Sequence, residues 1–292
     1  MREAIGPQTL WAMHPAALAE LLQQDRIEGM LPEGVRSFFG MAAGPAGAAK
    51  PADPVREGGT IVLPLSGALS PAGSYWGGTS TEKFVEQMRE AAADDRIGAI
   101  VLKVMSPGGL VWGTQEAGDA VFEARQAKPV IAVADKYAFS AAHWIATQAS
   151  AFYATPSGQV GSVGVRGGHV DMSGFEDKIG MKTTLIASDP KKVAGHPYAP
   201  LSDEDRADMQ AEIDEMAQAF NAAIARGRGM KASEVGAVHG TGQVFSAKRA
   251  AELGITDGVM SLREVVAKYS SPRARLDLQR KRVALQGQML GI

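Results

Sequence analysis

The sequence predicts an α/β protein organised around a parallel sheet, and two observations support that class. Apolar runs of strand length alternate along the chain with longer segments of helical periodicity. The runs at 97–105 and 129–134 are almost continuously apolar, which is typical of parallel strands that helices cover on both faces. Strand–helix–strand repetition at this spacing favours right-handed crossovers. At 292 residues, the chain is long enough to bury a full core without disulfides or a structural metal.

Changes in composition divide the chain into four parts. Residues 1–39 are expected to form a helical extension, because apolar residues recur at helical spacing over 8–30. Residues 40–57 are rich in Gly, Pro and Ala, which is typical of a linker. Residues 58–265 form the main α/β domain, and residues 266–292 form a basic C-terminal tail. The tail is either a frayed, solvated end or a helix that docks on a partner or another subunit.

Within the main domain, the elements can be assigned in order. Thr79 and Glu82 form a capping box for a helix to about residue 93, and Ser202 caps a long helix to about residue 226. The apolar residues of the long helix fall on one stripe: Met209, Ile213, Met216, Phe220 and Ile224. The other expected elements are strands at 61–69, 97–105, 129–134, 151–155 and 181–187, and helices that end near 126, start near Ser140 and span 246–254.

The composition also excludes several classes of function. The net charge is −2, so nothing attracts the whole chain to nucleic acid or to an anionic membrane. Cysteine is absent, which excludes a cysteine nucleophile and cysteine-based metal sites. The five histidines form no close ligand pair, so we expect no metal and no other cofactor. Charges and prolines interrupt the N-terminal apolar residues, so we expect neither a signal peptide nor a membrane anchor, and a cytoplasmic protein.

Two strand–turn–helix junctions carry residues that can do chemistry. The first is the SPGG run at 106–109, where glycine permits close approach of the backbone and free N–H groups at a helix start can form an oxyanion hole; alone, this run also fits a tight turn. The second is Ser140, between a buried strand and an apolar helix, where a serine is most often an N-cap. Because sites form beyond the carboxyl ends of parallel strands, the two junctions together can present a hydroxyl and two N–H donors to one carbonyl.

A nucleophilic serine needs a base, and the residues leave two kinds open. His143 follows Ser140 in the same helix and should not reach back to it with good geometry, so His169 is the histidine candidate. Lys191 and Lys192 are the lysine candidates. A free lysine is a poor base because its ordinary pKa is near 10.4, so a basic lysine must be buried in a well-packed site. A single lysine most often serves only surface solubility.

Several strings then occur in an order that is far more specific than any one of them. They are MSPGGLV, DKYAFSAAHWIA, GQVGSVGV and TLIASDPKKVAGHPYAPLSDEDR, continued by IARGRGM and VFSAKRAAELGITDGV. Over residues 58–262 they resemble the S49 serine peptidases, the signal peptide peptidase A family. The resemblance implies a ClpP/crotonase-like fold of repeated ββα units with a parallel sheet, flanked by the helical N-terminal extension and a C-terminal helical tail. It also implies that residues 58–265 are the peptidase domain.

The resemblance assigns catalytic roles to four residues. Ser140 matches the family nucleophile, and Lys192 matches the general-base lysine, with Lys191 as the neighbouring candidate. Gly109 matches the glycine whose N–H serves the oxyanion hole, and Ala141 supplies the second N–H. The implied site is therefore a Ser140–Lys192 dyad with two backbone donors.

The chain departs from the family pattern around the pocket. The family often has Asn where Met105 stands, and Ala or Gly where Phe139 stands. These differences change the shape of the pocket and leave the dyad intact. The GSVGV loop at 161–165 matches a family loop near the site, and we expect its Ser162 to be structural.

The implied function is a serine endopeptidase that acts on protein or peptide substrates as a homo-oligomer. The string GGHVDMSGFEDKIG and the start WAMHPAALAELL resemble the phage capsid-assembly proteases of the family. That subtype implies phage scaffold, portal or major capsid proteins as partners, in the host cytoplasm or the prohead. The alternatives are a bacterial cytosolic signal-peptide-peptidase-like protease, a ClpP-like Ser–His protease using His169, a crotonase-type CoA enzyme and a non-enzymatic capsid assembly factor.

Overall fold

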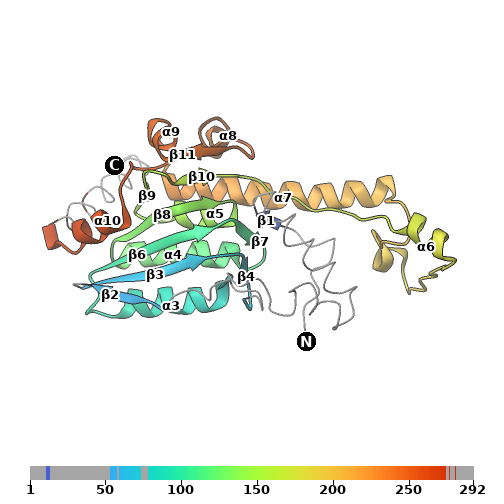
Figure 1. Ribbon diagram of the computed structural model, residues 1–292, viewed down its shortest axis with the longest axis horizontal. Helices are drawn as coiled ribbons and strands as arrows, with labels where there is room; N and C mark the ends of the chain where they lie inside the picture. The colour runs from blue at the N-terminus through green and yellow to red at the C-terminus, as the bar shows by residue number, and fades with distance from the viewer. Residues whose placement is uncertain are drawn as a thin grey trace, which may run out of the picture.

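The body of the molecule is a parallel sheet covered by helices, from which an arm projects (Figure 1). The computed structural model describes residues 11–13, 53–57, 59–73 and 78–273, with Leu276 and Arg280. Most of the predicted linker and most of the predicted tail therefore lie outside the described residues. In the part that is described, no helix is both long enough and apolar enough to cross a bilayer.

The main sheet has the strand order β11-β10-β8-β6-β3-β2, and β9 pairs with the first half of β8. Five strands are parallel: β3 (Thr60–Ser66), β6 (Ala99–Ser106), β8 (Val130–Phe139), β9 (Ala151–Ala154) and β10 (Gln159–Gly161). Two edge strands are antiparallel: β2 (Val55–Glu57) and β11 (Val244–Ser246). This topology confirms the predicted α/β class with a parallel, ClpP/crotonase-like sheet.

A second, smaller sheet lies where β3 and β6 end. It has the order β1-β7-β4-β5, and its strands are β1 (Trp11–Met13), β4 (Leu69–Ser70), β5 (Thr79–Ser80) and β7 (Gly108–Leu110). The helix expected over 8–30 is wrong at Trp11–Met13, because this segment pairs antiparallel with β7 instead. A strand edge with free backbone groups overrides a weak helical preference. The rest of 8–30 lies outside the described residues.

Helices cover both faces of the main sheet. On one face lie α3 (Thr81–Ala93), α4 (Thr114–Ala127) and α5 (Ala141–Thr147), whose buried side chains form one core with the strands. On the other face lies α10 (Leu262–Tyr269), which buries Val265, Val266 and Tyr269. Helix α10 therefore crosses residue 265, where the main domain was predicted to end.

The arm is formed by the segment after β10 and by the first half of the helix α7 (Asp203–Arg228) (Figure 1). It also contains α6 (Ser173–Ile179) and the 3-10 helix η1 (Pro190–Val193). After α7 the chain returns to the body through α8 (Ala232–His239) and α9 (Ala247–Glu252). The capped helices predicted at Ser202 and Ser246 are confirmed, since both hydroxyls accept the expected backbone N–H bond.

The predicted apolar stripe of α7 is buried only where the helix reaches the body. Phe220 and Ile224 are fully buried, whereas Met209 and Ile213 stay half-buried on the arm. The strand expected at 181–187 is wrong, because this segment has no strand structure and leaves the sheet with the arm. The arm exposes seven large apolar side chains: Met172, Phe175, Ile179, Met181, Leu185, Ile186 and Tyr198.

The capping box predicted from Thr79 and Glu82 is wrong, because α3 begins only at Thr81 and its third residue is Lys83, which has no carboxylate to complete a box. Ser80 is the N-cap, and its hydroxyl accepts the N–H of Lys83. The Thr79 hydroxyl instead exchanges hydrogen bonds with the backbone of Ser66 at 2.9 Å, one given and one received. Thr79 therefore ties the small sheet to the end of β3.

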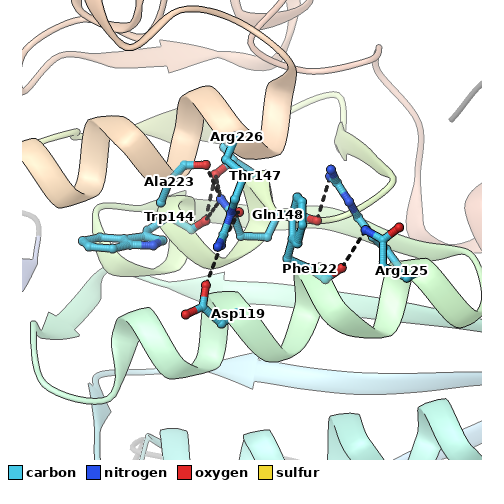
Figure 2. A network of polar contacts seen from close by, with 9 residues as sticks. Asp119, Phe122, Arg125, Trp144, Thr147, Gln148, Ala223 and Arg226 are labelled. Carbon is cyan, nitrogen blue, oxygen red and sulfur yellow. Dashed lines mark hydrogen bonds and ion pairs between the residues drawn. The ribbon is translucent and has the colours of Figure 1, made fainter. Parts of the chain in front are cut away.

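A polar network fastens α5 to α4 and α7 (Figure 2). The Gln148 amide donates to the carbonyls of Trp144 and Ala223 at 3.2 and 2.9 Å and accepts from the Arg226 guanidinium at 2.9 Å. Arg226 in turn pairs with Asp119 of α4 at 2.6 Å. Because Gln148 is fully buried, these bonds replace the water that its amide would otherwise need.

We expect Gln148→Ala to lower the free energy of unfolding by about 2–4 kcal/mol, because it leaves buried partners unsatisfied and opens a cavity. Urea denaturation followed by circular dichroism measures the loss. Gln126→Ala on α4 is the matched control, since the exposed Gln126 amide donates to one carbonyl of its own helix. Equal losses in the two variants would contradict a structural role for the network.

Candidate active site

Ser140 lies on a sharp turn between β8 and α5, and its backbone is strained. Its φ is 53° and its ψ is −120°, a region that residues other than glycine rarely adopt. Its N–H donates to the carbonyl of Gly161 at 2.9 Å, and its carbonyl accepts the N–H of Trp144 at 2.9 Å. The side chain makes no capping bond, which argues against a simple N-cap. Some hydrolases present a nucleophilic serine on a strained strand-to-helix turn of this kind.

Gly109 lies in strand β7, so the expected position at a helix start is wrong. Helix α4 begins only at Thr114, and the N–H of Gly109 is therefore a strand donor. Only glycine fits here, because an added Cβ would lie 2.0 Å from the carbonyl oxygen of Leu69. The preceding turn is held by Ser106, whose hydroxyl donates to the carbonyl of Gly67 at 2.6 Å and accepts the N–H of Gly108 at 3.1 Å.

The register of the sheet brings the two junctions together. Ser106 at the end of β6 pairs with Ala138, two residues before Ser140, and α5 contacts β7. Ala141 is the first residue of α5, so its N–H has no acceptor within the helix. Ser140 and the backbone donors of Gly109 and Ala141 thus lie at the same end of the sheet. Their catalytic roles stay predictions.

The GSVGV loop supports the Ser140 turn from β10. Ser162 also has a positive φ of 56°, and its N–H donates to the carbonyl of Gln243 at 2.6 Å. Its neighbour Gly161 accepts the N–H of Ser140. These bonds suit the structural role predicted for Ser162.

His143 faces the interior of the body. Its Nε2 lies 3.0 Å from Nδ1 of His239 on α8, and both rings are fully buried. Burial, the neighbouring His239 and then Arg228 lower the pKa of His143 well below its ordinary value. Burial and then Arg228 lower the pKa of His239 to about 4. Both rings are therefore neutral at pH 7. His143 contacts His239 and not Ser140, which agrees with the prediction that His143 does not reach back to the serine.

Lys191 is held in its charged form by two carboxylates at the start of α7. Its Nζ lies 2.6 Å from Asp208 and 2.8 Å from Glu204. The hydrogen bonds to Asp208 and then Glu204 raise the pKa of Lys191 above its ordinary value. A protonated lysine cannot accept a proton, so this arrangement argues against Lys191 as the general base.

Lys192 lies on η1, far out on the arm, and its side chain is exposed. Asp208, which anchors this turn, precedes Phe220 by twelve residues in α7, or roughly 18 Å along a helix. Phe220 is the residue that stacks on Trp144 of α5, with ring centroids 4.7 Å apart. No hydrogen bond between described residues joins Lys192 to Ser140. One chain alone therefore does not bury Lys192 beside the serine.

His169 also lies on the arm, and its ring contacts the arm's own backbone. Its Nδ1 lies 3.2 Å from the carbonyl of Gly195, and its Nε2 lies 3.2 Å from the carbonyl of Ala199. Both ring nitrogens are directed at these carbonyl oxygens, so neither is turned toward Ser140 as a base. His169 thereby joins the outgoing and returning segments of the arm.

Three features of this region escaped the sequence analysis. The His143–His239 pair joins residues 96 positions apart, and no local pattern predicts such a contact. The pairing of Trp11–Met13 with β7 likewise depends on where the strand edge lies. In the sequence, the strain at Ser140 is indicated by the run of small residues that follows the serine.

The buried histidines predict a loss of stability in acid. In the unfolded chain both rings protonate near the ordinary pKa of about 6.5, whereas the folded chain resists that charge. Stability is therefore complete above pH 6.5 and falls as the pH drops toward 4, by about 3 kcal/mol for His239 alone. We expect His239→Gln to flatten the dependence of the melting temperature on pH, as thermal denaturation from pH 8 to 4 can show. His196→Gln on the arm should leave that dependence unchanged; equal slopes in both variants would refute this account.

Comparisons with known proteins point to one family for this chain. A family model described as "Peptidase family S49" matches residues 123–276, a little over half of the chain. "Head-tail preconnector protein GP5" of Enterobacteria phage P21 is 32% identical over 228 residues, which are 76% of this chain and 45% of that protein. "Capsid assembly protease C" of Escherichia phage lambda is 30% identical over 233 residues, 77% of this chain and 51% of that protein.

The chain spans about half the length of these curated relatives. Among solved structures, a ClpP1 mutant from Listeria monocytogenes aligns with a TM-score of 0.45 at 14% identity, over 70% of this chain and 92% of that chain. The family model begins within α4 and ends after α10, so its match includes the Ser140 turn. The chain belongs to peptidase family S49.

Proposed function

We propose that this chain is a serine endopeptidase with Ser140 as its nucleophile. The observation that carries the proposal is the strained turn at Ser140, with φ 53°, at the carboxyl end of a parallel sheet and beside the glycine strand β7. Maintaining such a backbone costs about 1–3 kcal/mol, and a plain helix cap needs no such strain. Family membership supports the same role for the serine.

The proposed mechanism uses four groups of the protein and no cofactor. The Ser140 oxygen attacks the carbonyl carbon of the scissile bond while the neutral Lys192 amine takes the hydroxyl proton. The N–H groups of Gly109 and Ala141 donate to the oxygen as it gains negative charge. The lysine then gives its proton to the leaving amine, and an acyl-enzyme ester remains. Water attacks the ester, the same amine takes the water's proton, and the departing serine oxygen recovers a proton.

In this proposal a neighbouring copy supplies the lysine. Lys192 is exposed on the arm of its own chain, and an exposed ammonium is strongly hydrated and has no free electron pair with which to accept a proton. The arm also exposes the seven large apolar side chains named above, which a second copy can cover. Burial in that interface would remove water from Lys192 and favour its neutral form.

The proposed substrates are phage structural proteins. The names of the two phage relatives refer to capsid assembly and to the head-tail preconnector, and the sequence resembles the phage subtype of the family. We propose cleavage of scaffold, portal or major capsid protein in the host cytoplasm or the prohead. Among the alternatives, the Ser–His protease is disfavoured because both nitrogens of His169 face backbone carbonyls.

Ser140→Ala should abolish peptidase activity while the melting temperature stays within a few degrees. The Ser140 hydroxyl forms the covalent bond to the substrate, so activity depends on it. It makes no capping bond, so its loss should change stability little. Covalent labelling by a fluorophosphonate, together with cleavage of labelled casein, measures activity. Ser162→Ala is the matched control, because Ser162 is also a buried serine with positive φ. Full labelling of the Ser140→Ala chain would show that Ser140 is not the nucleophile.

Mixing two inactive variants tests the origin of the lysine. Ser140→Ala and Lys192→Ala should each be inactive alone, and a co-refolded mixture should regain roughly a quarter of the activity if two copies pair at random and each pair shares its sites. Lys192→Arg should be as inactive as Lys192→Ala, because a guanidinium keeps its proton. Lys191→Ala should retain most of its activity. A mixture that stays inactive, beside an active wild type, would show that the dyad forms within one chain or does not form.

Co-expression with candidate scaffold, portal and capsid proteins tests the substrate class. Mass spectrometry should find fragments with the wild-type chain that are missing with Ser140→Ala. If the phage proteins stay intact in both samples while casein is cleaved normally, the chain is a peptidase whose substrates belong to another class.

A further inference from the structure

Strand β7 has two edges, and this chain covers both of them. Strand β4 takes one edge, with Leu69 opposite Gly109. Strand β1 takes the other, with Trp11 opposite Leu110, Ala12 opposite Gly109 and Met13 opposite Gly108. In Figure 1, β1 lies beside β7 at the carboxyl ends of the main strands.

An extended peptide that approaches Ser140 along β7 has only the β1 edge to use. The β4 edge is closed, because an added Cβ at Gly109 would already meet the backbone of Leu69 at 2.0–2.6 Å. Strand addition to an open sheet edge is a common way to bind an extended peptide. In this structure, backbone from the chain's own N-terminal part occupies that edge.

We propose that the segment containing Trp11–Met13 is an internal inhibitor that must leave β7 before an extended substrate can bind. This inference rests on the proposed function. Among the described residues, β1 pairs with β7 through three residues, so the strand is short enough to exchange. A tethered strand competes at an effective concentration on the order of millimolar, which a weakly bound peptide does not overcome. A protein substrate that is held at a high local concentration overcomes this competition.

The absence of cysteine from the chain permits a direct test by a disulfide. Trp11 and Leu110 are directly opposed across β1 and β7, and opposed Cα atoms in an antiparallel pair lie about 4.5–5.5 Å apart, within the range that a disulfide spans. Trp11→Cys combined with Leu110→Cys should therefore form a disulfide on oxidation. Leu110 is half-buried and has no role in the proposed chemistry.

The matched control is Met13→Cys combined with Leu110→Cys. This pair is out of register by two residues, and such diagonal neighbours lie about 7–8 Å apart, too far for a good disulfide. Two readouts are compared for each variant, oxidised and reduced. Cleavage of labelled casein needs the edge of β7, whereas a small fluorophosphonate can react with Ser140 without pairing along that edge.

We expect oxidation of the in-register pair to lower casein cleavage by about tenfold or more, because the fraction of chains with an open edge falls. Fluorophosphonate labelling should change less than twofold, and a reducing agent should restore casein cleavage. The control pair should show neither disulfide nor loss. In the Ser140→Ala chain, which carries no cysteine substitution, hydrogen exchange should show protected amides at 11–13 that lose protection when casein saturates the chain.

Three results would overturn the inference in different ways. Failure of the in-register pair to cross-link, together with unprotected amides at 11–13, would show that β1 does not hold the edge. A complete disulfide with unchanged casein cleavage would show that the edge is not used by substrate. A reduced variant and a wild type that neither label nor cleave would overturn the proposed function itself, while the disulfide yield would still report on β1.

Discussion

The backbone turn at Ser140 is the constraint on which the candidate site depends. The turn places a residue other than glycine at φ 53°, and the surrounding contacts must offset the roughly 1–3 kcal/mol that such strain costs. Gly161 on β10 accepts the serine N–H, and every residue of α5 is buried. The Gln148 network then joins α5 to α4 and α7 (Figure 2). A well-packed body thus sets the direction of one hydroxyl.

One of the two proposed oxyanion donors comes from a strand and not from the helix that follows the serine. The Gly109 N–H belongs to a short strand whose position is set by Leu69 on one side and by the Ser106 turn on the other. Another extended chain can pair with the edge of a strand, whereas it cannot pair with the start of a helix. The same geometry that can stabilise an oxyanion therefore provides an edge for an extended chain, and β1 is the segment that lies there.

The arm separates the two halves of the proposed dyad. Its long helix is buried at Phe220 and Ile224 but not at Met209 or Ile213, and Lys191 holds the η1 turn to the unburied half. Exposed apolar side chains of this kind mark a surface on which proteins associate, and Lys192 is exposed on the same arm. Under the proposed function, contact between copies covers these side chains and completes the site in one step. Assembly and activity are then coupled through the same surface.

The sequence by itself determined the alternation of strands and helices, the parallel sheet and the position of both junctions, because apolar periodicity and glycine act locally. The resemblance of the ordered motifs to a known family assigned roles to Ser140, Lys192, Gly109 and Ala141, and these roles stay predictions. Tertiary structure alone decided that SPGG leads into a strand, that 181–187 leaves the sheet, and that Trp11–Met13 pairs with β7. Each of these depends on which edge or surface is left open after the core forms, and neighbouring residues in the chain do not encode that. The distance between Ser140 and Lys192 is of the same kind, since it follows from where α7 leaves the body and not from the 52 residues that separate them.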